Sequence, residues 1–153
     1  MEQYIQSYEG IIDKIIKIHK NSLKEIIISI KNLNIYDDDF LLRLVSYLKL
    51  CKLYEITNEF FRDFKYYILS LGDSYFIFYD GKHCSCDLEI NKKIQYKNIC
   101  IHLLVFKIFL GINNYTKMEI DKNKMKELIN EINKRNKSKI FYLCNIMKEL
   151  LIK

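Results

Sequence analysis

Five of the eight cysteine and histidine residues of this chain lie within the twenty residues from 83 to 102. An even distribution along the sequence would place about one there. The pattern is Cys84-Ser85-Cys86, then thirteen residues, then Cys100-Ile101-His102. Three thiolates and one imidazole form a ligand set that tetrahedral zinc favours, with Zn–S bonds of about 2.3 Å and Zn–N bonds of about 2.0–2.1 Å. The pattern therefore predicts one zinc ion bound by Cys84, Cys86, Cys100 and His102.

The spacing inside each half of the pattern restricts the backbone around the four ligands. Residues two apart on a strand point to the same face, so Cys84 and Cys86 can meet one ion if a strand continues through them. Residues two apart inside a helix differ by about 200° and point apart. We therefore expect Cys100 at or before the first turn of a helix and His102 just inside it. Four protein ligands leave no open coordination position, which indicates a structural site. The alternative is a set of buried thiols with a core histidine.

The predicted fold class is α+β: N-terminal helices, a β-hairpin and a C-x-C…C-x-H zinc site packed on C-terminal helices. Apolar residues at helical spacing predict helices over residues 3–20, 22–33, 40–51, 99–110, 121–133 and 140–152. Ser22 and Glu25 fit a capping box, and Gly111 is a natural left-handed residue after a helix. The hairpin is expected from aromatic and aliphatic runs at 66–71 and 75–79 around the Gly72-Asp73 turn. The expected organisation is an N-terminal helical region (1–63), a zinc finger of hairpin plus helix (64–112) and C-terminal helices (113–153), within one compact domain.

Composition narrows the class of function. The chain is 50% hydrophobic, which is enough for a core, and its formal charge of +6 permits an acidic partner without requiring one. The sequence contains no phosphate-binding glycine loop, no dinucleotide-binding glycine motif, no H-E-x-x-H and no G-x-S-x-G, so we expect no enzyme activity. The sequence has no uncharged apolar run of about 18 residues, so we expect no membrane helix. Met1-Glu2-Gln3-Tyr4 lacks a basic segment followed by an apolar one, so we expect no secretory signal. We therefore expect a reducing compartment, where cysteines serve as thiols or metal ligands.

The same cysteines and histidine carry a family resemblance. His83-Cys84-Ser85-Cys86 and Cys100-Ile101-His102-Leu103-Leu104 resemble the two halves of a SWIM zinc finger. With the preceding Asp38-Asp39-Phe40-Leu41-Leu42 and the small size of the chain, residues from roughly 36 to 130 resemble the Shu-complex SWIM subunit family. Two positions depart from the family pattern, since Ile101 stands where a basic residue is common and Asp87 where proline is frequent.

This resemblance implies one structural Zn²⁺ on Cys84, Cys86, Cys100 and His102. It also implies a non-enzymatic subunit that assists recombinase filament assembly or stability on single-stranded DNA in homologous recombination repair. The implied partner is an obligate RecA-fold recombinase paralog, with single-stranded DNA contacted directly or through the complex. The implied location is the nucleus, with no membrane contact and no small-molecule substrate.

Two alternatives stay open. A SWIM module could bind DNA directly, with the lysines near the finger lining the surface: Lys82, Lys92, Lys93 and Lys97. It could also act as a protein-interaction adaptor in transcription or ubiquitin pathways.

The remaining cysteines and histidines have simpler interpretations. We interpret His83 as a surface residue, assign His19 no function, and expect Cys51 and Cys144 to be core thiols on apolar helix faces.

Overall fold

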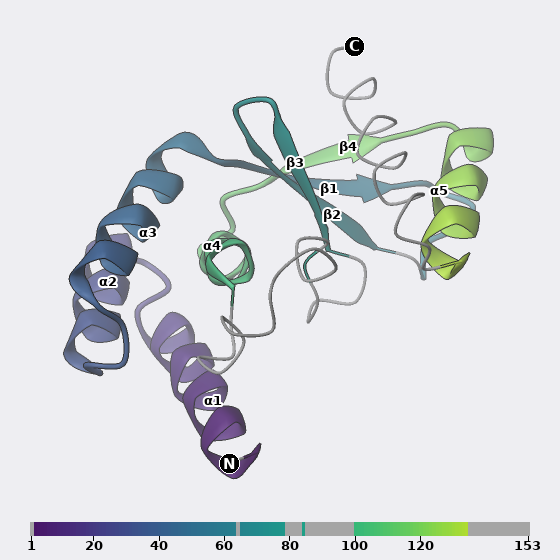
Figure 1. The fold of residues 1–153 in the computed structure, drawn as a ribbon. Helices are drawn as coiled ribbons and strands as arrows, with labels where there is room; N and C mark the ends of the chain where they lie inside the picture. Colours follow the sequence, from purple (N-terminus) through teal and green to yellow (C-terminus); the bar gives the residue numbers. More distant parts are fainter. Residues whose placement is uncertain (1, 64, 79–83, 85–99, 135–153) are drawn as a thin grey trace. The chain divides into compact units, whose positions relative to one another are not determined.

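A computed structural model describes residues 2–63, 65–78, 84 and 100–134 of the chain. This part of the chain is α+β and contains five helices and a four-stranded mixed sheet (Figure 1). The chain divides into two compact units, which are described separately. The first unit comprises Met1–Cys51 and Ile90–Asn114, and the second comprises Lys52–Glu89 and Tyr115–Lys153.

The first unit is helical in its described part. Its helices are α1 (Glu2–Ile18), α2 (Leu23–Asn32), α3 (Asp38–Leu50) and α4 (Ile101–Gly111). Side-chain oxygens cap two of them, because the first N–H groups of a helix have no partner inside it. The Ser22 hydroxyl accepts from the Glu25 N–H at 3.3 Å, and an Asp37 carboxylate oxygen accepts from the Phe40 N–H at 2.8 Å. The helix start predicted at Ser22 is confirmed.

Helix α4 is the central apolar element of the first unit. Six of its residues are buried, and it contacts both α1 and α3. At the rim of this packing, the Lys107 ammonium binds the Asp13 carboxylate at 3.1 Å. Gly111 lies so close to α1 that an added Cβ would overlap the Ile16 side chain. The expectation that Gly111 is the left-handed residue after the helix is wrong, because Gly111 is the last helical residue and Asn113 adopts the positive φ of 58°.

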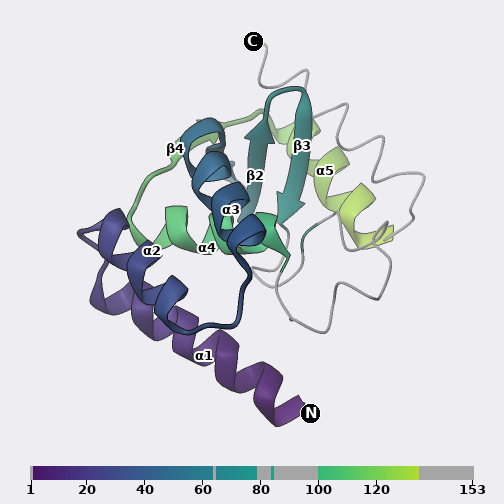
Figure 2. The same cartoon turned by 60° about the vertical axis from the view of Figure 1, so that its left-hand side comes forward.

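The second unit is built on the sheet, whose strands are β1 (Lys52–Thr57), β2 (Tyr66–Leu71), β3 (Ser74–Phe78) and β4 (Thr116–Glu119). Their order is β3-β2-β1-β4. Strands β2 and β3 run side by side in opposite directions and form the predicted hairpin (Figure 2). Gly72 has φ +58° in its turn, a conformation that glycine adopts without steric cost. Strand β1 is antiparallel to β2 and parallel to β4.

Helix α5 (Lys122–Lys134) provides the other half of this unit's core. Asp121 caps it, with a carboxylate oxygen accepting from the Lys124 N–H at 2.8 Å. Met125 and Leu128 of α5 pack in one cluster with side chains from the sheet, namely Ile56, Tyr66, Ile68 and Ile77. The register pairs Ile56 with Tyr66 and Ile68 with Ile77, and Tyr66 and Ile68 are two apart on β2, so all four side chains lie on the same face of the sheet.

The sheet is larger than the sequence predicts. Strand β1 lies inside the range 1–63 that was expected to be helical, and β4 lies in the stretch 113–153 that was expected to hold only helices. The helix predicted over 140–152, which includes Cys144, lies outside the described residues, as do Lys82, Lys92, Lys93 and Lys97. None of the described helices is long and apolar enough to cross a membrane.

Candidate metal centre

Cys84 lies shortly after strand β3. It forms an isolated antiparallel bridge with Phe78, the last residue of that strand. The Cys84 residue is only 1% exposed, and Phe78 is fully buried. The bridge holds the Cys84 backbone at the end of the hairpin. The expected strand-like setting of this cysteine is therefore present at residue 84 itself.

Cys100 is the N-cap of α4, with the extended backbone expected of a residue just before a helix. Its Sγ accepts a hydrogen bond from the Leu103 N–H at 3.2 Å, and its carbonyl accepts from the Leu104 N–H at 3.1 Å. An N–H donor and the positive end of a helix both stabilise negative charge on sulfur. Cys100 is half-buried, so its local setting suits a thiolate ligand.

His102 is the second residue of α4 and is also half-buried. Its imidazole stacks on the ring of Tyr47 from α3, with centroids 5.9 Å apart and an interplanar angle of 11°. The stack restricts the orientation of the imidazole plane. Nothing in the sequence singles out Tyr47, which is one of several aromatic residues on amphipathic helices.

The potential ligand atoms of Cys84, Cys100 and His102 all lie within 4.8 Å of one another. Neighbouring ligand atoms on tetrahedral zinc are about 3.3–3.8 Å apart, as follows from the bond lengths. Two sulfurs and one imidazole nitrogen at this separation can hold a metal ion after small side-chain adjustments. Cys86, the fourth predicted ligand, and His83 lie outside the described residues.

Cys51 does not belong to this group. Residue Cys51 is 7% exposed, and burial raises the pKa of its thiol to about 11. Such a thiol stays protonated at neutral pH and is a poor metal ligand. Its prediction as a core thiol is confirmed, with one correction: Cys51 is the C-cap of α3, next to the start of β1, and is not within the helix.

Comparisons of the chain with protein-family models, curated proteins and solved structures gave no match. The resemblance to the SWIM finger therefore stays a prediction that rests on the residues of the cysteine–histidine pattern. The geometry of Cys84, Cys100 and His102 is an independent observation, because it comes from the fold and not from the motif alone.

Proposed function

We propose that the chain is a non-enzymatic zinc-binding subunit of a Shu-like complex that assists recombinase filaments on single-stranded DNA. The observation that carries this proposal is the group of Cys84, Cys100 and His102, whose potential ligand atoms lie within 4.8 Å of one another. The members of this group belong to the C-x-C and C-x-H halves of the pattern that resembles a SWIM finger.

Zinc is the proposed ion because of the donor chemistry. Thiolate sulfur and imidazole nitrogen together select zinc over the hard cations, which prefer oxygen ligands. Cys86 is proposed as the fourth ligand, since the C-x-C spacing keeps it close to Cys84 along the chain. A closed set of four protein ligands would make the zinc structural, which agrees with the proposed absence of enzyme activity.

The proposed zinc would act on folding. It would link chain positions 84–86 to positions 100–102 and close the intervening segment into a loop. Because a preformed site rarely exists in an unfolded chain, the free energy of binding such an ion contributes directly to folding. The ion would thereby stabilise the start of α4, where Cys100 already caps the helix.

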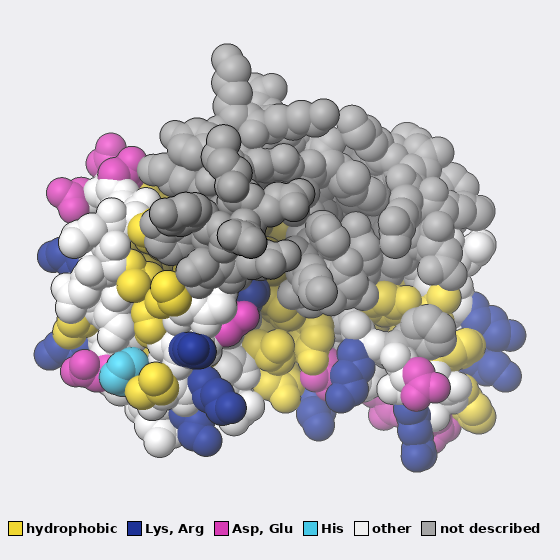
Figure 3. All heavy atoms as spheres, turned by 90° about the horizontal axis from the view of Figure 1, so that it is seen from below, with side chains coloured by type: hydrophobic (Ala, Val, Ile, Leu, Met, Phe, Trp, Pro, Cys, Tyr) yellow, Lys and Arg dark blue, Asp and Glu magenta, His cyan; other side chains and the backbone are white. Residues whose placement is uncertain are grey.

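Binding a protein partner is proposed as the main activity, with a RecA-fold recombinase paralog as that partner and the nucleus as the location. The charge pattern of the described residues supports a protein partner. Among the described residues on the face in Figure 3, basic and acidic side chains are intermixed with exposed hydrophobic ones. A surface that binds DNA by itself gathers lysine and arginine on one face.

Affinity purification of the tagged chain from its own cells, followed by mass spectrometry, tests this proposal. Recovery of a RecA-fold protein with the wild-type chain, and its loss with Cys100→Ala, is the expected result. Cys51→Ala is the matched control, because it removes a buried cysteine outside the group and should retain the partner. Recovery of only transcription or ubiquitin machinery would contradict the recombination function and favour the adaptor alternative.

A further inference from the structure

A cleft of about 390 Å³ lies in the second unit, and its lining includes no residue of the candidate metal centre. It forms where β1 and β4 end side by side and includes the segment that follows β1. Its lining holds three carboxylates and three cationic side chains: Glu55, Glu59, Glu119, Arg62, Lys65 and Lys117. The charges of the lining cancel, so a ligand that carries charges of both signs suits this cleft better than a polyanion.

Glu55 is the most buried of these charged residues. It is only 4% exposed, and the Tyr67 hydroxyl donates a hydrogen bond to its Oε2 at 2.9 Å. Tyr67 is held in turn by an edge-to-face contact with Tyr115. Burial, together with the bond to Glu55, raises the pKa of Tyr67, so this hydroxyl stays protonated and keeps donating.

Among the residues that the structure describes, none supplies a basic side chain as a partner for Glu55. Within the described residues, no lysine, arginine or histidine nitrogen lies within 4.0 Å of its carboxylate. Lys117 stands opposite Glu55 in the β1–β4 register, yet the two form no ion pair. A buried carboxylate is costly unless a cation or several donors satisfy it. One neutral hydroxyl leaves most of its acceptor capacity unused, so Glu55 is suited to receive a cationic group from a ligand.

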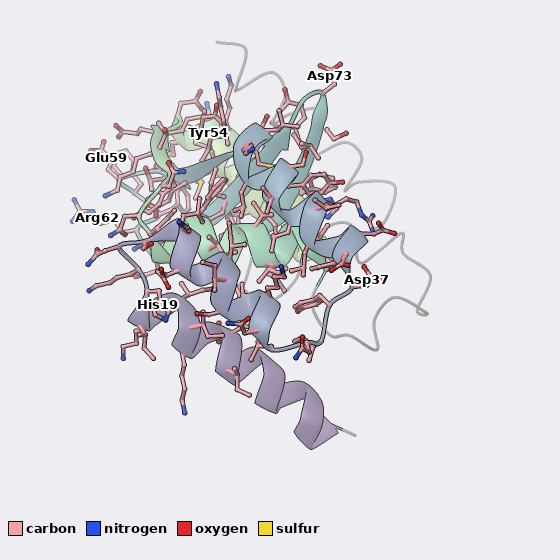
Figure 4. The ribbon with its side chains drawn as sticks, turned by 90° about the vertical axis from the view of Figure 1, so that its left-hand side faces the viewer. His19, Asp37, Tyr54, Glu59, Arg62 and Asp73 are labelled. Atoms are coloured by element: carbon pink, nitrogen blue, oxygen red, sulfur yellow. The ribbon has the colours of Figure 1, made fainter. Side chains whose placement is uncertain are left out.

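Arg62 offers the complementary charge. Its Nε donates to the Glu59 carbonyl oxygen at 3.2 Å, which orients the guanidinium and leaves its terminal nitrogens without a bond to any described residue. Figure 4 shows Glu59 and Arg62 on the same side of this unit. The planar fork of an arginine matches a carboxylate with two parallel hydrogen bonds. Arg62 is therefore suited to bind a carboxylate of the same ligand.

We propose that this cleft binds the C-terminal arginine or lysine of a partner polypeptide, with the side-chain cation at Glu55 and the terminal carboxylate at Arg62. The cleft is large enough to hold a whole arginine or lysine residue, which at a C-terminus carries both a side-chain cation and a carboxylate. The residues of this cleft are not those of the candidate metal centre. The peptide-binding proposal therefore does not depend on the proposed recombination function.

The ligand side of the proposal is tested with the unmodified full-length protein. The probe is the tripeptide Gly-Gly-Arg, titrated by calorimetry and by NMR. Replacing its arginine by neutral citrulline, or capping its carboxylate as the amide, should each weaken binding by about tenfold or more, because each change removes one charge-assisted contact. Equal binding of all three peptides would overturn the proposal. If free L-arginine binds as tightly as Gly-Gly-Arg, the claim that the ligand is the end of a polypeptide is contradicted.

Variants of Glu55 and Arg62 test which residue binds which charge of the peptide. Each variant should affect only the peptides that carry the charge its residue binds. Glu55→Gln should weaken Gly-Gly-Arg by about tenfold or more but leave the citrulline peptide unchanged. Arg62→Gln should weaken Gly-Gly-Arg but leave the amide-capped peptide unchanged. Matched controls outside the cleft are Asp73→Asn and Arg43→Gln, which should bind like the wild type. Uniform weakening of every peptide by a cleft variant would contradict the assignment of that residue.

Discussion

The ring of Tyr47 lies nearly parallel to the imidazole of His102, at an interplanar angle of 11° and a centroid distance of 5.9 Å. The two rings come from α3 and α4, which contact each other in the first unit. Residues that orient a metal ligand without touching the ion often affect metal affinity almost as much as the ligands do. Tyr47 is thus a positioning residue for the proposed zinc ligand His102.

Removal of the Tyr47 ring should weaken zinc binding. We expect Tyr47→Ala to lower the zinc affinity about tenfold, the lower end of the effect of losing an orienting neighbour. Tyr47→Phe keeps the stack and should bind zinc like the wild type. Competition with a chromophoric chelator at neutral pH measures these affinities. Equal affinities of the alanine variant and the wild type would show that the stack does not position His102.

The contribution of the Cys51 thiol to the free energy of unfolding should decrease at high pH. Burial raises the pKa of its thiol from 9.0 to about 11, so the unfolded chain loses this proton at a lower pH than the folded chain. The resulting contribution to stability is fully present below pH 9 and is lost as the pH rises towards 11. The slope is about 1.4 kcal/mol per pH unit. Urea unfolding of the wild type and of Cys51→Ala between these pH values measures the difference, which should shrink as the pH rises. A constant difference would contradict this pKa.

Two glycines in helices should respond oppositely to alanine. Gly10 in α1 has nothing within 4 Å of an added Cβ, so Gly10→Ala should stabilise the protein by about 0.5–1 kcal/mol through helix propensity. Gly111→Ala places its Cβ against Ile16 and should cost about 1–3 kcal/mol. Chemical denaturation of both variants checks the signs. Stabilisation by both would show that α1 and α4 do not approach closely at Gly111.

We expect the hydrogen bonds of Asn58 to stabilise the second unit. This buried side chain donates from Nδ2 to the Ile120 carbonyl at 2.7 Å and accepts at Oδ1 from the Phe60 N–H at 2.8 Å. Asn58→Ala removes both bonds and leaves a buried carbonyl without this donor, which should cost about 1–3 kcal/mol. The exposed Asn32→Ala serves as the control and should change the unfolding free energy by less than about 0.5 kcal/mol. Similar unfolding curves for the two variants would contradict this role of Asn58.

Local signals in the sequence predict much of the first unit and the hairpin. Ser22 followed by Glu25 marks a helix start, and Gly72-Asp73 marks the hairpin turn, where Gly72 adopts a positive φ of 58°. The position of Cys100 before α4 follows from helix geometry, since residues 100 and 102 could not meet one ion from inside a helix. These features depend on neighbours within a few residues.

The missed elements depend on distant partners. Strand β1 begins at Lys52, directly after the C-cap Cys51, with no glycine or proline to announce the change from helix to strand. Strand β4 has only four residues, three of them exposed, and gains its partner through parallel pairing with β1. The stack of Tyr47 on His102 likewise joins two helices far apart in the sequence. Periodicity along the chain carries no information about such pairings.

The central claim is that Cys84, Cys86, Cys100 and His102 bind one structural zinc ion, and native mass spectrometry with metal analysis tests it most directly. We expect about one zinc per wild-type chain, its loss in Cys86→Ala and in Cys100→Ala, and its retention in the Cys51→Ala control. Chelation should also lower the melting temperature of the wild type. A metal-free chain that melts at the same temperature with and without added zinc would contradict the claim.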